Sequence, residues 1–395
     1  MQGSEKKISW KDPGTLAIIA GLVLLAWVVF FFLRGQTAMT GSGKEFVSVS
    51  GGDRHTVAVR KDGTVWAWGS NYYGQLGDGT TKDRPAPVRV GGLSNIIAVA
   101  AGYDHSLALR KDGTVWAWGA NFVGQLGDGT TKEKLVPVRV SFLREVLSVK
   151  AGFGTSLALK ADGTVWSWGA NAYGQLGDGT TQNRSTPVMV VGLLDAVQID
   201  TSYTFSVALK RDGTVYTWGE NRFGQMGDGT TLNKTAPYLL KDFAGIVSMA
   251  AGNWHILAVK GDGTVWGMGL DWYGQLGDGA LKIVKPKPVQ AAGLEDIVSV
   301  AAGEGHSLAV KRDGTIWAFG DNGSGQLGDG STEVRIKPVQ IVGISGAVMA
   351  DAGKNFSCIV LSDGTVRMCG ENRKGQMGGG AAGDPQLIPA PVAVN

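Results

Sequence analysis

WGSNYYGQLGDGTT, at residues 68–81, recurs with small changes along almost the whole chain. Related stretches lie at residues 118–131, 168–181, 218–231, 268–280, 319–332 and 369–380. An accompanying Asp-Gly-Thr run places its aspartates at Asp62, Asp112, Asp162, Asp212, Asp262, Asp313 and Asp363. The period is therefore fifty residues with one step of fifty-one, and it gives seven repeats from Phe46 to the end of the chain. Such a period indicates one array of supersecondary units, not two or three unrelated domains.

A single repeat reads as four short strands. In the second repeat, residues 96–140, the runs IIAVA, HSLALR, TVWAWG and PVRV are rich in β-branched, leucine and tryptophan residues. Gly, Asp, Asn and Pro separate these runs, and none of them has a helical period. Each repeat is thus expected to form a four-stranded antiparallel sheet.

The Asp112-Gly113 dipeptide is typical of a two-residue hairpin turn, and such a turn predicts the register of the two inner strands. That register pairs Lys111 with Thr114, Leu109 with Trp116, and Leu107 with Trp118. One face of the sheet then holds the large side chains, and the other face holds Ala108 and Ala117.

Both faces of such a sheet require an apolar neighbour. A ring of sheets in which large faces cover small faces meets this requirement, so the sequence predicts an all-β, seven-bladed β-propeller of four-stranded antiparallel blades. An open solenoid is the alternative, but it needs end repeats with a polar face, and none appears at Phe46 or Asn395.

The repeated loop itself resembles ligand loops only superficially. Its glycines permit the backbone conformations of a long return to the outer strand. A Walker loop needs GxxxxGK[ST], and an EF-hand loop needs several acidic ligands where this loop has only Asp78. We therefore interpret the Gly-Asp-Gly-Thr element as architecture.

An apolar run precedes the repeats. Residues 14–33 contain no charged side chain, and a helix of that length spans the roughly 30 Å hydrocarbon layer. A cleaved signal peptide is the alternative, but its apolar region is shorter. We predict a cytoplasmic tail at residues 1–13, a transmembrane helix at 14–33, a flexible linker at 34–45 and the propeller at 46–395. The lysines before the run favour a cytoplasmic N-terminus, with the propeller on the periplasmic side of the inner membrane.

The overall charge is close to neutral. The chain has 37 Lys and Arg residues against 34 Asp and Glu residues. The first 45 residues hold five of the former and three of the latter, which leaves 32 against 31 in the repeats. Because nucleic acid requires a basic footprint, we expect no nucleic-acid partner.

The motifs AAGxxHSLAL, KDGTVWAWG, GxNxxGQLGDG and a terminal PVxV resemble those of the regulator-of-chromosome-condensation repeat family. The resemblance covers about 350 residues and implies a seven-bladed propeller. The eukaryotic founder is a nucleotide-exchange factor for a small GTPase that uses an inserted wedge and a basic tail. The repeat spacing leaves no room for a wedge, so we expect no small GTPase partner. The chain looks more like bacterial members, one of which is a secreted β-lactamase inhibitor that binds through one propeller face.

Catalytic, metal and cofactor sites have no candidate residues in the sequence. The four histidines, His55, His105, His255 and His306, share one position of the repeat, where other repeats place Thr155, Phe205 and Phe356. A position that tolerates Phe indicates packing, not catalysis. With no HExxH, CxxC or GxSxG pattern, we predict a protein without enzymatic activity, metal or cofactor.

The two cysteines flank the Asp363-Gly364 turn. In the register proposed above, Cys358 and Cys369 lie directly opposite each other, which predicts a disulfide in the last blade. A disulfide would in turn indicate an oxidising compartment.

Variable positions in two loops of each repeat fall on one face of the predicted ring. In the first five repeats these positions are aromatic: Tyr72, Tyr73, Tyr103, Phe122, Phe153, Tyr173, Tyr203, Phe223, Trp254, Trp272 and Tyr273. The last two repeats place polar and charged residues there instead, among them Glu304 and Lys354. An aromatic surface with a charged rim is typical of protein interfaces, although the rings could instead fold down and cap the core.

These patterns predict a noncatalytic, membrane-anchored interaction module. We expect a scaffold or accessory subunit of a larger membrane complex, which binds membrane or periplasmic proteins and contacts the bilayer through residues 14–33. The alternative is a periplasmic or surface module that captures a soluble protein, peptide or glycan on the aromatic positions.

Overall fold

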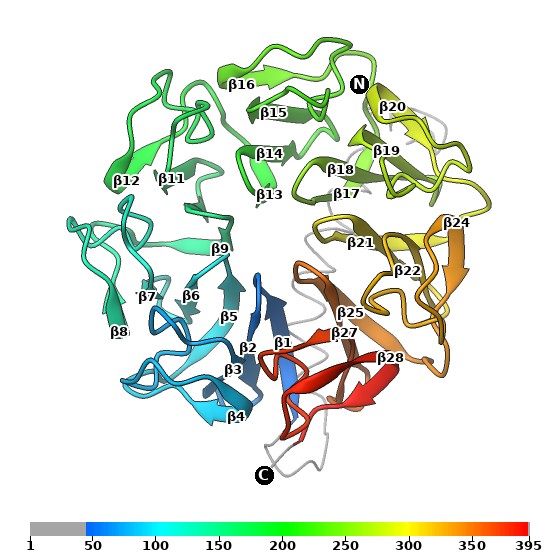
Figure 1. Ribbon diagram of the computed structural model, residues 1–395. Coiled ribbons are helices and arrows are strands. Elements are labelled where there is room, and N and C mark those ends of the chain that lie inside the picture. Colours follow the sequence, from blue (N-terminus) through cyan, green and yellow to red (C-terminus); the bar gives the residue numbers. More distant parts are fainter. Residues whose placement is uncertain (1–44, 394–395) are drawn as a thin grey trace, which may run out of the picture.

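The computed structural model describes residues 45–393, which form seven four-stranded antiparallel sheets arranged in a ring (Figure 1). Blades 1 to 3 comprise β1 (Phe46–Gly51), β2 (His55–Arg60), β3 (Val65–Gly69), β4 (Arg84–Arg89), β5 (Ile96–Ala101), β6 (His105–Arg110), β7 (Val115–Gly119), β8 (Lys134–Arg139), β9 (Val146–Ala151), β10 (Thr155–Lys160), β11 (Val165–Gly169) and β12 (Arg184–Met189). Blades 4 and 5 comprise β13 (Ala196–Thr201), β14 (Phe205–Lys210), β15 (Val215–Gly219), β16 (Lys234–Leu239), β17 (Ile246–Ala251), β18 (His255–Lys260), β19 (Val265–Leu270) and β20 (Val284–Gln290). Blades 6 and 7 comprise β21 (Ile297–Ala302), β22 (His306–Lys311), β23 (Ile316–Gly320), β24 (Arg335–Gln340), β25 (Ala347–Ala352), β26 (Phe356–Leu361), β27 (Val366–Asn372) and β28 (Gly383–Pro391). The predicted seven-bladed propeller is confirmed.

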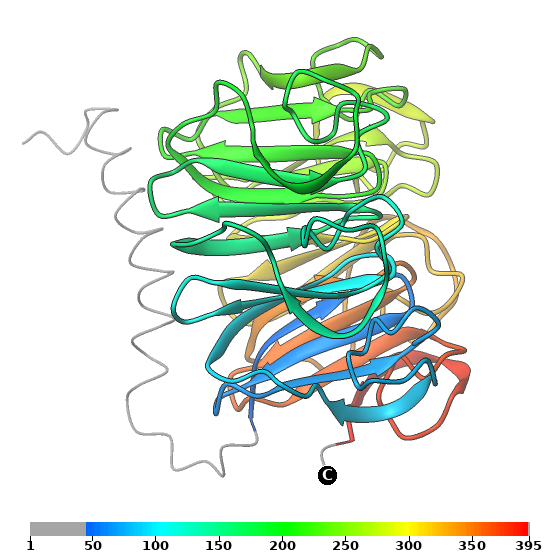
Figure 2. The same cartoon turned by 90° about the vertical axis from the view of Figure 1, so that its left-hand side faces the viewer.

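The loops of the ring gather at two opposite faces (Figure 2). One face, which we call the aromatic face, bears the loops that follow the first and third strand of each blade; Ser70 N donates to Arg54 O between two such loops. The other, the hairpin face, bears the Asp-Gly turns and the connections between blades, because Ile96 N donates to Gly63 O.

The hairpin turn differs from the prediction by one residue. Gly113 N donates to Arg110 O and Arg110 N donates to Thr114 O, so the loop has three residues and ends on Gly113 at φ 76°. This is a type I turn followed by a glycine bulge. The pairs are therefore Leu109 with Val115, Ala108 with Trp116, Leu107 with Ala117, and Ser106 with Trp118. The two-residue register was wrong, and the tryptophans lie on the face opposite to Leu107 and Leu109.

Blades pack with the tryptophan face of one against the aliphatic face of the blade before it. Trp118 is fully buried against Val57, Val59 and Leu76 of blade 1. Its indole nitrogen also donates to Gln75 O at 2.8 Å. The expected packing of large faces on small faces is thus replaced by aromatic on aliphatic faces.

The ring closes without strand exchange. Blade 1 consists of β1–β4 and blade 7 of β25–β28, each continuous in sequence. Trp68 of blade 1 donates to Gln376 O of blade 7 at 2.8 Å, and Phe46 N donates to Gly364 O at 3.0 Å. The first and last blades lie side by side in Figure 1, and the open solenoid is excluded.

The predicted disulfide is absent. The observed register differs from the predicted one by one residue, so the two cysteines are not paired across the strands. Cys369 pairs with Ser357, and Cys358 pairs with Met368, so the two thiols lie on opposite faces of the sheet. Both cysteines are free and buried. Cys369 takes the place of the blade tryptophan, while Cys358 packs toward blade 1. The inference of an oxidising compartment therefore loses its basis.

The histidines and the repeated loop are architectural, as predicted. His105 is fully buried, and its Nε2 lies 2.9 Å from Ser156 Oγ of the next blade. Ser156 Oγ in turn donates to Gln125 O, so the histidine is the donor in the first contact. In the repeated loop, Asn71 is fully buried and donates to Asp78 and to Thr80 O. The polar groups of this loop bind one another.

The predicted transmembrane helix at residues 14–33 and the linker at 34–45 lie outside the described residues, apart from Glu45. Within residues 45–393, no helix has the length and apolar character needed to span a bilayer.

Candidate partner-binding site

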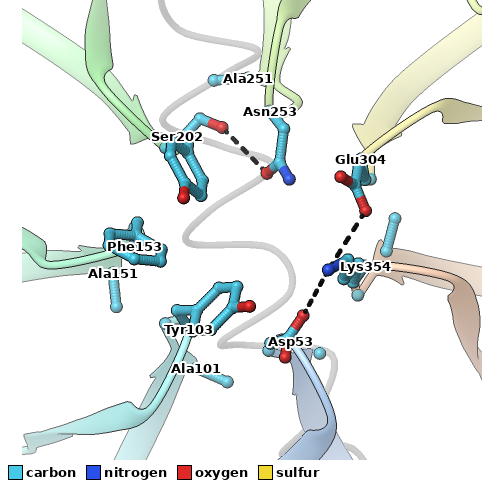
Figure 3. Close-up of a pocket in the computed structure, with 18 of the residues that line it drawn as sticks. Asp53, Ala101, Tyr103, Ala151, Phe153, Ser202, Ala251, Asn253, Glu304 and Lys354 are labelled. Carbon is cyan, nitrogen blue, oxygen red and sulfur yellow. Dashed lines mark hydrogen bonds and ion pairs between the residues drawn. The ribbon is translucent and has the colours of Figure 1, made fainter. Parts of the chain in front are cut away.

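The aromatic face surrounds the mouth of the central channel. The loops that follow the innermost strands of the blades line a cavity of about 90 Å³ there (Figure 3). Tyr103 and Phe153 lie on one side of this mouth, and Asp53, Lys354 and Glu304 lie on the other. The mouth therefore has an aromatic half and a charged half.

The aromatic half is a continuous arc of rings. Ring centroids are separated by 4.6 Å between Tyr103 and Phe153, and by 4.2 Å between Phe153 and Tyr203. The arc continues from Tyr203 to Trp254 at 5.0 Å and from Trp254 to Phe223 at 5.4 Å. Four of these rings come from the first loops of blades 2 to 5. Ring pairs at these separations are favourable in themselves, so the arc is held in place before any partner binds.

These rings do not cap the core. Phe153 is 40% exposed, and the other four rings of the arc are partly exposed. The guanidinium group of Arg222 lies 4.8 Å from both the Phe223 and the Trp254 ring and fixes that end of the arc. The arc thus presents aromatic surface to solvent.

Five of the six other predicted aromatic residues form two smaller groups outside the arc. Tyr73 contacts Tyr72 and Phe122 edge-on, with centroids 4.7 and 5.1 Å away. Trp272 and Tyr273 stack at 6.4 Å. Tyr72, Phe122 and Trp272 are 73, 58 and 65% exposed. Tyr173 is also exposed, at 39%. We call Tyr72, Tyr73, Phe122, Trp272 and Tyr273 the rim aromatics.

The charged half centres on Lys354. Its Nζ lies 3.5 Å from Asp53 Oδ1 and 3.6 Å from Glu304 Oε2, which links blades 1, 6 and 7. The same ammonium group lies 5.7 Å from the centre of the Tyr103 ring, so it also touches the arc. Burial lowers the pKa of Lys354, but the attraction of Asp53 and Glu304 outweighs it and the net shift is upward. Lys354 is therefore a permanently charged cation between two acids.

The acids around the mouth are less strongly ionised than usual. Burial raises the pKa of Asp53 and Glu304, and the nearby Lys354 reduces the shift. Burial and the charge of Asp53 raise the pKa of Asp104 to about 6. Asp104 also accepts from Gln75 Nε2 at 3.0 Å. Asp104, next to Tyr103 in the chain, can therefore change its charge near pH 6.

Sequence reasoning found the aromatic residues of the arc but missed Asp53 and Asp104. The sequence could have indicated both residues. Each lies in the loop after the first strand of its blade, and the equivalent loops supply Tyr103 and Phe153. Between the innermost strands β9 and β13, Lys150 Nζ lies 3.4 Å from Asp200 Oδ1, a pair that the sequence also did not single out. Among residues 45–393, no group of three or more His, Cys, Asp and Glu side chains is placed to hold a metal ion.

Comparison with known proteins places this geometry among related propellers. A family model described as the RCC1-like domain matches residues 34–290. Models of the regulator of chromosome condensation (RCC1) repeat match residues 297–326, 350–376 and 313–360. The RCC2 homolog of Danio rerio is 42% identical over 50 residues, which are 13% of this chain and 10% of that protein. This match thus spans only about a tenth of the relative's length.

Two solved structures share the fold over most of the chain. Human WBSCR16 superposes with a TM-score of 0.75 at 25% identity and covers 84% of this chain and 94% of its own. Prp20p of Saccharomyces cerevisiae superposes with a TM-score of 0.75 at 24% identity, covering 84% and 86%.

One expectation about partners must be corrected. The structure of Prp20p is described together with its binding properties to Gsp1p, a small GTPase, and to histones. Because a protein of the same fold has such partners, the exclusion of a small GTPase partner was wrong. Neither the spacing of the repeats nor their charge rules this class out.

Proposed function

The chain belongs to the RCC1-like domain family, and from this premise we propose that it is a protein-binding module that docks its partner on the aromatic face. The observation behind this proposal is the unbroken arc from Tyr103 to Phe223, with Lys354 at its edge. Aromatic rings held by their neighbours bury large areas at low entropic cost, which is the composition of binding hot spots.

The size of the mouth favours a macromolecular partner. Small-molecule sites usually enclose about 300–1,000 Å³, whereas the cavity at the channel mouth has about 90 Å³. That volume suits one inserted side chain. The surrounding rings and the rim aromatics extend the surface over blades 1 to 5 and offer area for a protein.

The proposal includes a membrane location. The uncharged run at residues 14–33 favours a single-pass anchor with a cytoplasmic N-terminus. The propeller would then act as a scaffold or accessory subunit beside a larger membrane complex, by binding and without catalysis of its own.

Capture of a soluble protein or peptide is the second candidate. Asp53 and Glu304 form a cation site that Lys354 occupies in this structure. A basic side chain from a peptide could compete with Lys354 for these carboxylates, which favours this candidate over glycan capture.

The test is a quantitative pull-down of the full chain from native membranes in mild detergent, followed by mass spectrometry. Replacing Tyr103, Phe153 and Tyr203 together by Ala should remove a stoichiometric partner, while replacing the exposed pair Val191 and Leu194 on the hairpin face by Ala should retain it. A partner that both variants retain equally would overturn the proposal. An integral membrane partner supports the accessory subunit, and a soluble partner supports capture.

A further inference from the structure

Blade 2 breaks the repeat on the hairpin face at a position with left-handed backbone. The connection between blades has Gly92, Gly192, Gly293 and Gly343 at this position in blades 1, 3, 5 and 6, with φ from 67° to 73°. Blade 2 has Phe142 there, at φ 59°. Asp242 holds this position in blade 4, at φ 60°, and the other non-glycine residues with positive φ are Asn95, Glu145, Asp195 and Asp296, so all except Phe142 are polar. A bulky side chain in this region is strained.

No packing contact compensates for that strain. A Cβ added at any of the four equivalent glycines would have no atom within 4 Å. A side chain at this position therefore projects into solvent, and Phe142 is 91% exposed. Strain that the fold does not need is a marker of function.

A basic cavity lies on the hairpin face of blade 2 and includes Arg139 and Arg144, which flank Phe142 in the sequence. It has a volume of about 640 Å³ and is lined by Arg110, Asp112, Thr114, Trp116, Arg139, Arg144 and Glu145. Glu145 lies 4.0 Å from Lys160, and Asp112 accepts from Thr114 N within the turn. Within residues 45–393, no salt bridge joins any of the three arginines to an acid. Blade 6 has Gln340 and Ser345 in place of Arg139 and Arg144.

The cavity also holds an unsatisfied hydrogen-bond donor. In blades 1, 3 and 5 the equivalent indole nitrogens of Trp66, Trp166 and Trp266 donate to a threonine hydroxyl at 3.0–3.2 Å. The Trp116 nitrogen is buried and has no partner among the described residues. Its ring lies under the Arg110 guanidinium group, 5.0 Å away. An anionic oxygen would satisfy both groups.

The chain joins the ring on this same face. Glu45 O accepts from Lys61 N in the hairpin of blade 1, at 2.9 Å. The twelve residues at 34–45 separate this point from the uncharged run at 14–33, and they extend over at most about 40 Å. If that run spans a bilayer, the hairpin face cannot be far from it.

We propose that the hairpin face of blade 2 binds anionic phospholipid at the bilayer surface. Arg110, Arg139 and Arg144 bind headgroup phosphates together with the Trp116 N–H, and Phe142 inserts at the interface. An exposed aromatic side chain among arginines is the composition of interfacial anchors. The location of this site near a bilayer rests on the membrane anchor of the proposed function. The consequence is an aromatic face that is directed away from the membrane.

The experiment measures hydrogen–deuterium exchange of the full chain in nanodiscs of phosphatidylcholine, with and without phosphatidylglycerol. Amides of residues 141–145 should exchange more slowly in the anionic discs, and the equivalent loop at residues 342–346 in blade 6 should not change. Arg139→Gln with Arg144→Ser installs the blade 6 residues and should reduce the slowing by roughly fivefold per arginine. Phe142→Gly should also reduce it without lowering the melting temperature, since glycine relieves the strain.

Equal exchange of residues 141–145 in the two lipids would overturn the proposal. So would the same slowing after inorganic phosphate is added to neutral discs, because that result identifies a soluble anion site. A chain that does not incorporate into discs would instead refute the anchor. The same comparison with added anionic and neutral vesicles would then decide the lipid contact by itself.

Discussion

The aromatic face and the hairpin face are built from the same seven repeats, but they depart from the repeat in different ways. On the aromatic face the departure is distributed, because each of blades 1 to 5 contributes its own ring to a shared surface. On the hairpin face the turns repeat closely, and the strongest departure is concentrated in blade 2, at Phe142 and Arg144.

The difference shows what each face has to do. Neither set of residues is required by blade packing, which is carried out by the buried tryptophans, leucines and valines between the sheets. A distributed aromatic surface suits a broad protein partner, whereas one strained anchor with arginines suits a local contact. Changes in the core should affect both faces, whereas a change on one face should affect that face alone.

Acid should destabilise both faces together. Burial lowers the pKa of the four histidines to about 3 or 4 in the fold, below the usual 6.5. The neutral histidines therefore contribute their full stability to the fold above pH 6.5. This contribution is lost as the pH falls toward 3 or 4. Four protons are taken up by the histidines on unfolding, and Asp104, with its pKa of about 6, releases one. The net uptake is at most three, because the pKa values of Asp53 and Glu304 are also raised in the fold. The free energy of unfolding should fall by up to about 4 kcal/mol per pH unit between pH 6 and 4.5. Denaturant titrations followed by tryptophan fluorescence check this, and a flat profile would contradict it.

Removal of one interblade tryptophan should also weaken the whole ring. Trp118→Ala empties a fully buried site and leaves Gln75 O without its donor, at a cost of about 3–5 kcal/mol. Tyr72→Ala, at a side chain 73% exposed, should change stability by less than about 0.5 kcal/mol. Similar losses in the two variants would show that the rim ring is part of the core.

Binding should depend on the arc more than on the rim. The triple alanine variant of Tyr103, Phe153 and Tyr203 should lose about 2–4 kcal/mol of partner affinity. The variant of Tyr73, Phe122 and Trp272 should lose less, because these rings belong to two separate small groups. Titration of the partner identified by pull-down gives both affinities. Equal losses would show that the partner also contacts the rim aromatics. An arc variant that binds with unchanged affinity would show that the partner does not bind at the channel mouth.

The smallest effect is expected at the strained anchor. Phe142→Gly removes a left-handed penalty of about 1–2 kcal/mol, less about 0.5–1 kcal/mol for the added freedom of glycine when unfolded. The propeller should become more stable by about 1 kcal/mol while its affinity for the protein partner stays unchanged. A lower melting temperature would mean that Phe142 has a packing role.

The sequence predicted the fold to the level of strands and blades, because a fifty-residue period with four strand-like runs allows few alternatives. The register could not be predicted from the Asp112-Gly113 dipeptide, since two-residue and three-residue turns both place Gly at positive φ. Hydrophobicity did not decide between them either. Both faces of a blade are buried, so no polar face fixes which residues point which way. The false pairing of Cys358 with Cys369 followed from this single error.

The candidate site was predicted only in part, because the sequence does not show how loops of different blades meet. Loop aromatics such as Phe153 and Trp254 can be recognised where a repeat varies, but their assembly into one arc depends on ring geometry. The link from Asp53 through Lys354 to Glu304 crosses the closure between the last and first blades. Residues 300 positions apart in the sequence give no sign of such a contact.

The most direct test of two separate functional faces is photo-crosslinking of the full chain in native membranes. The crosslinker p-benzoylphenylalanine would replace Phe153 in one variant and Phe142 in another. We predict a discrete protein adduct from position 153 and a lipid adduct from position 142. A protein adduct from position 142, with none from position 153, would contradict the assignment of the two faces.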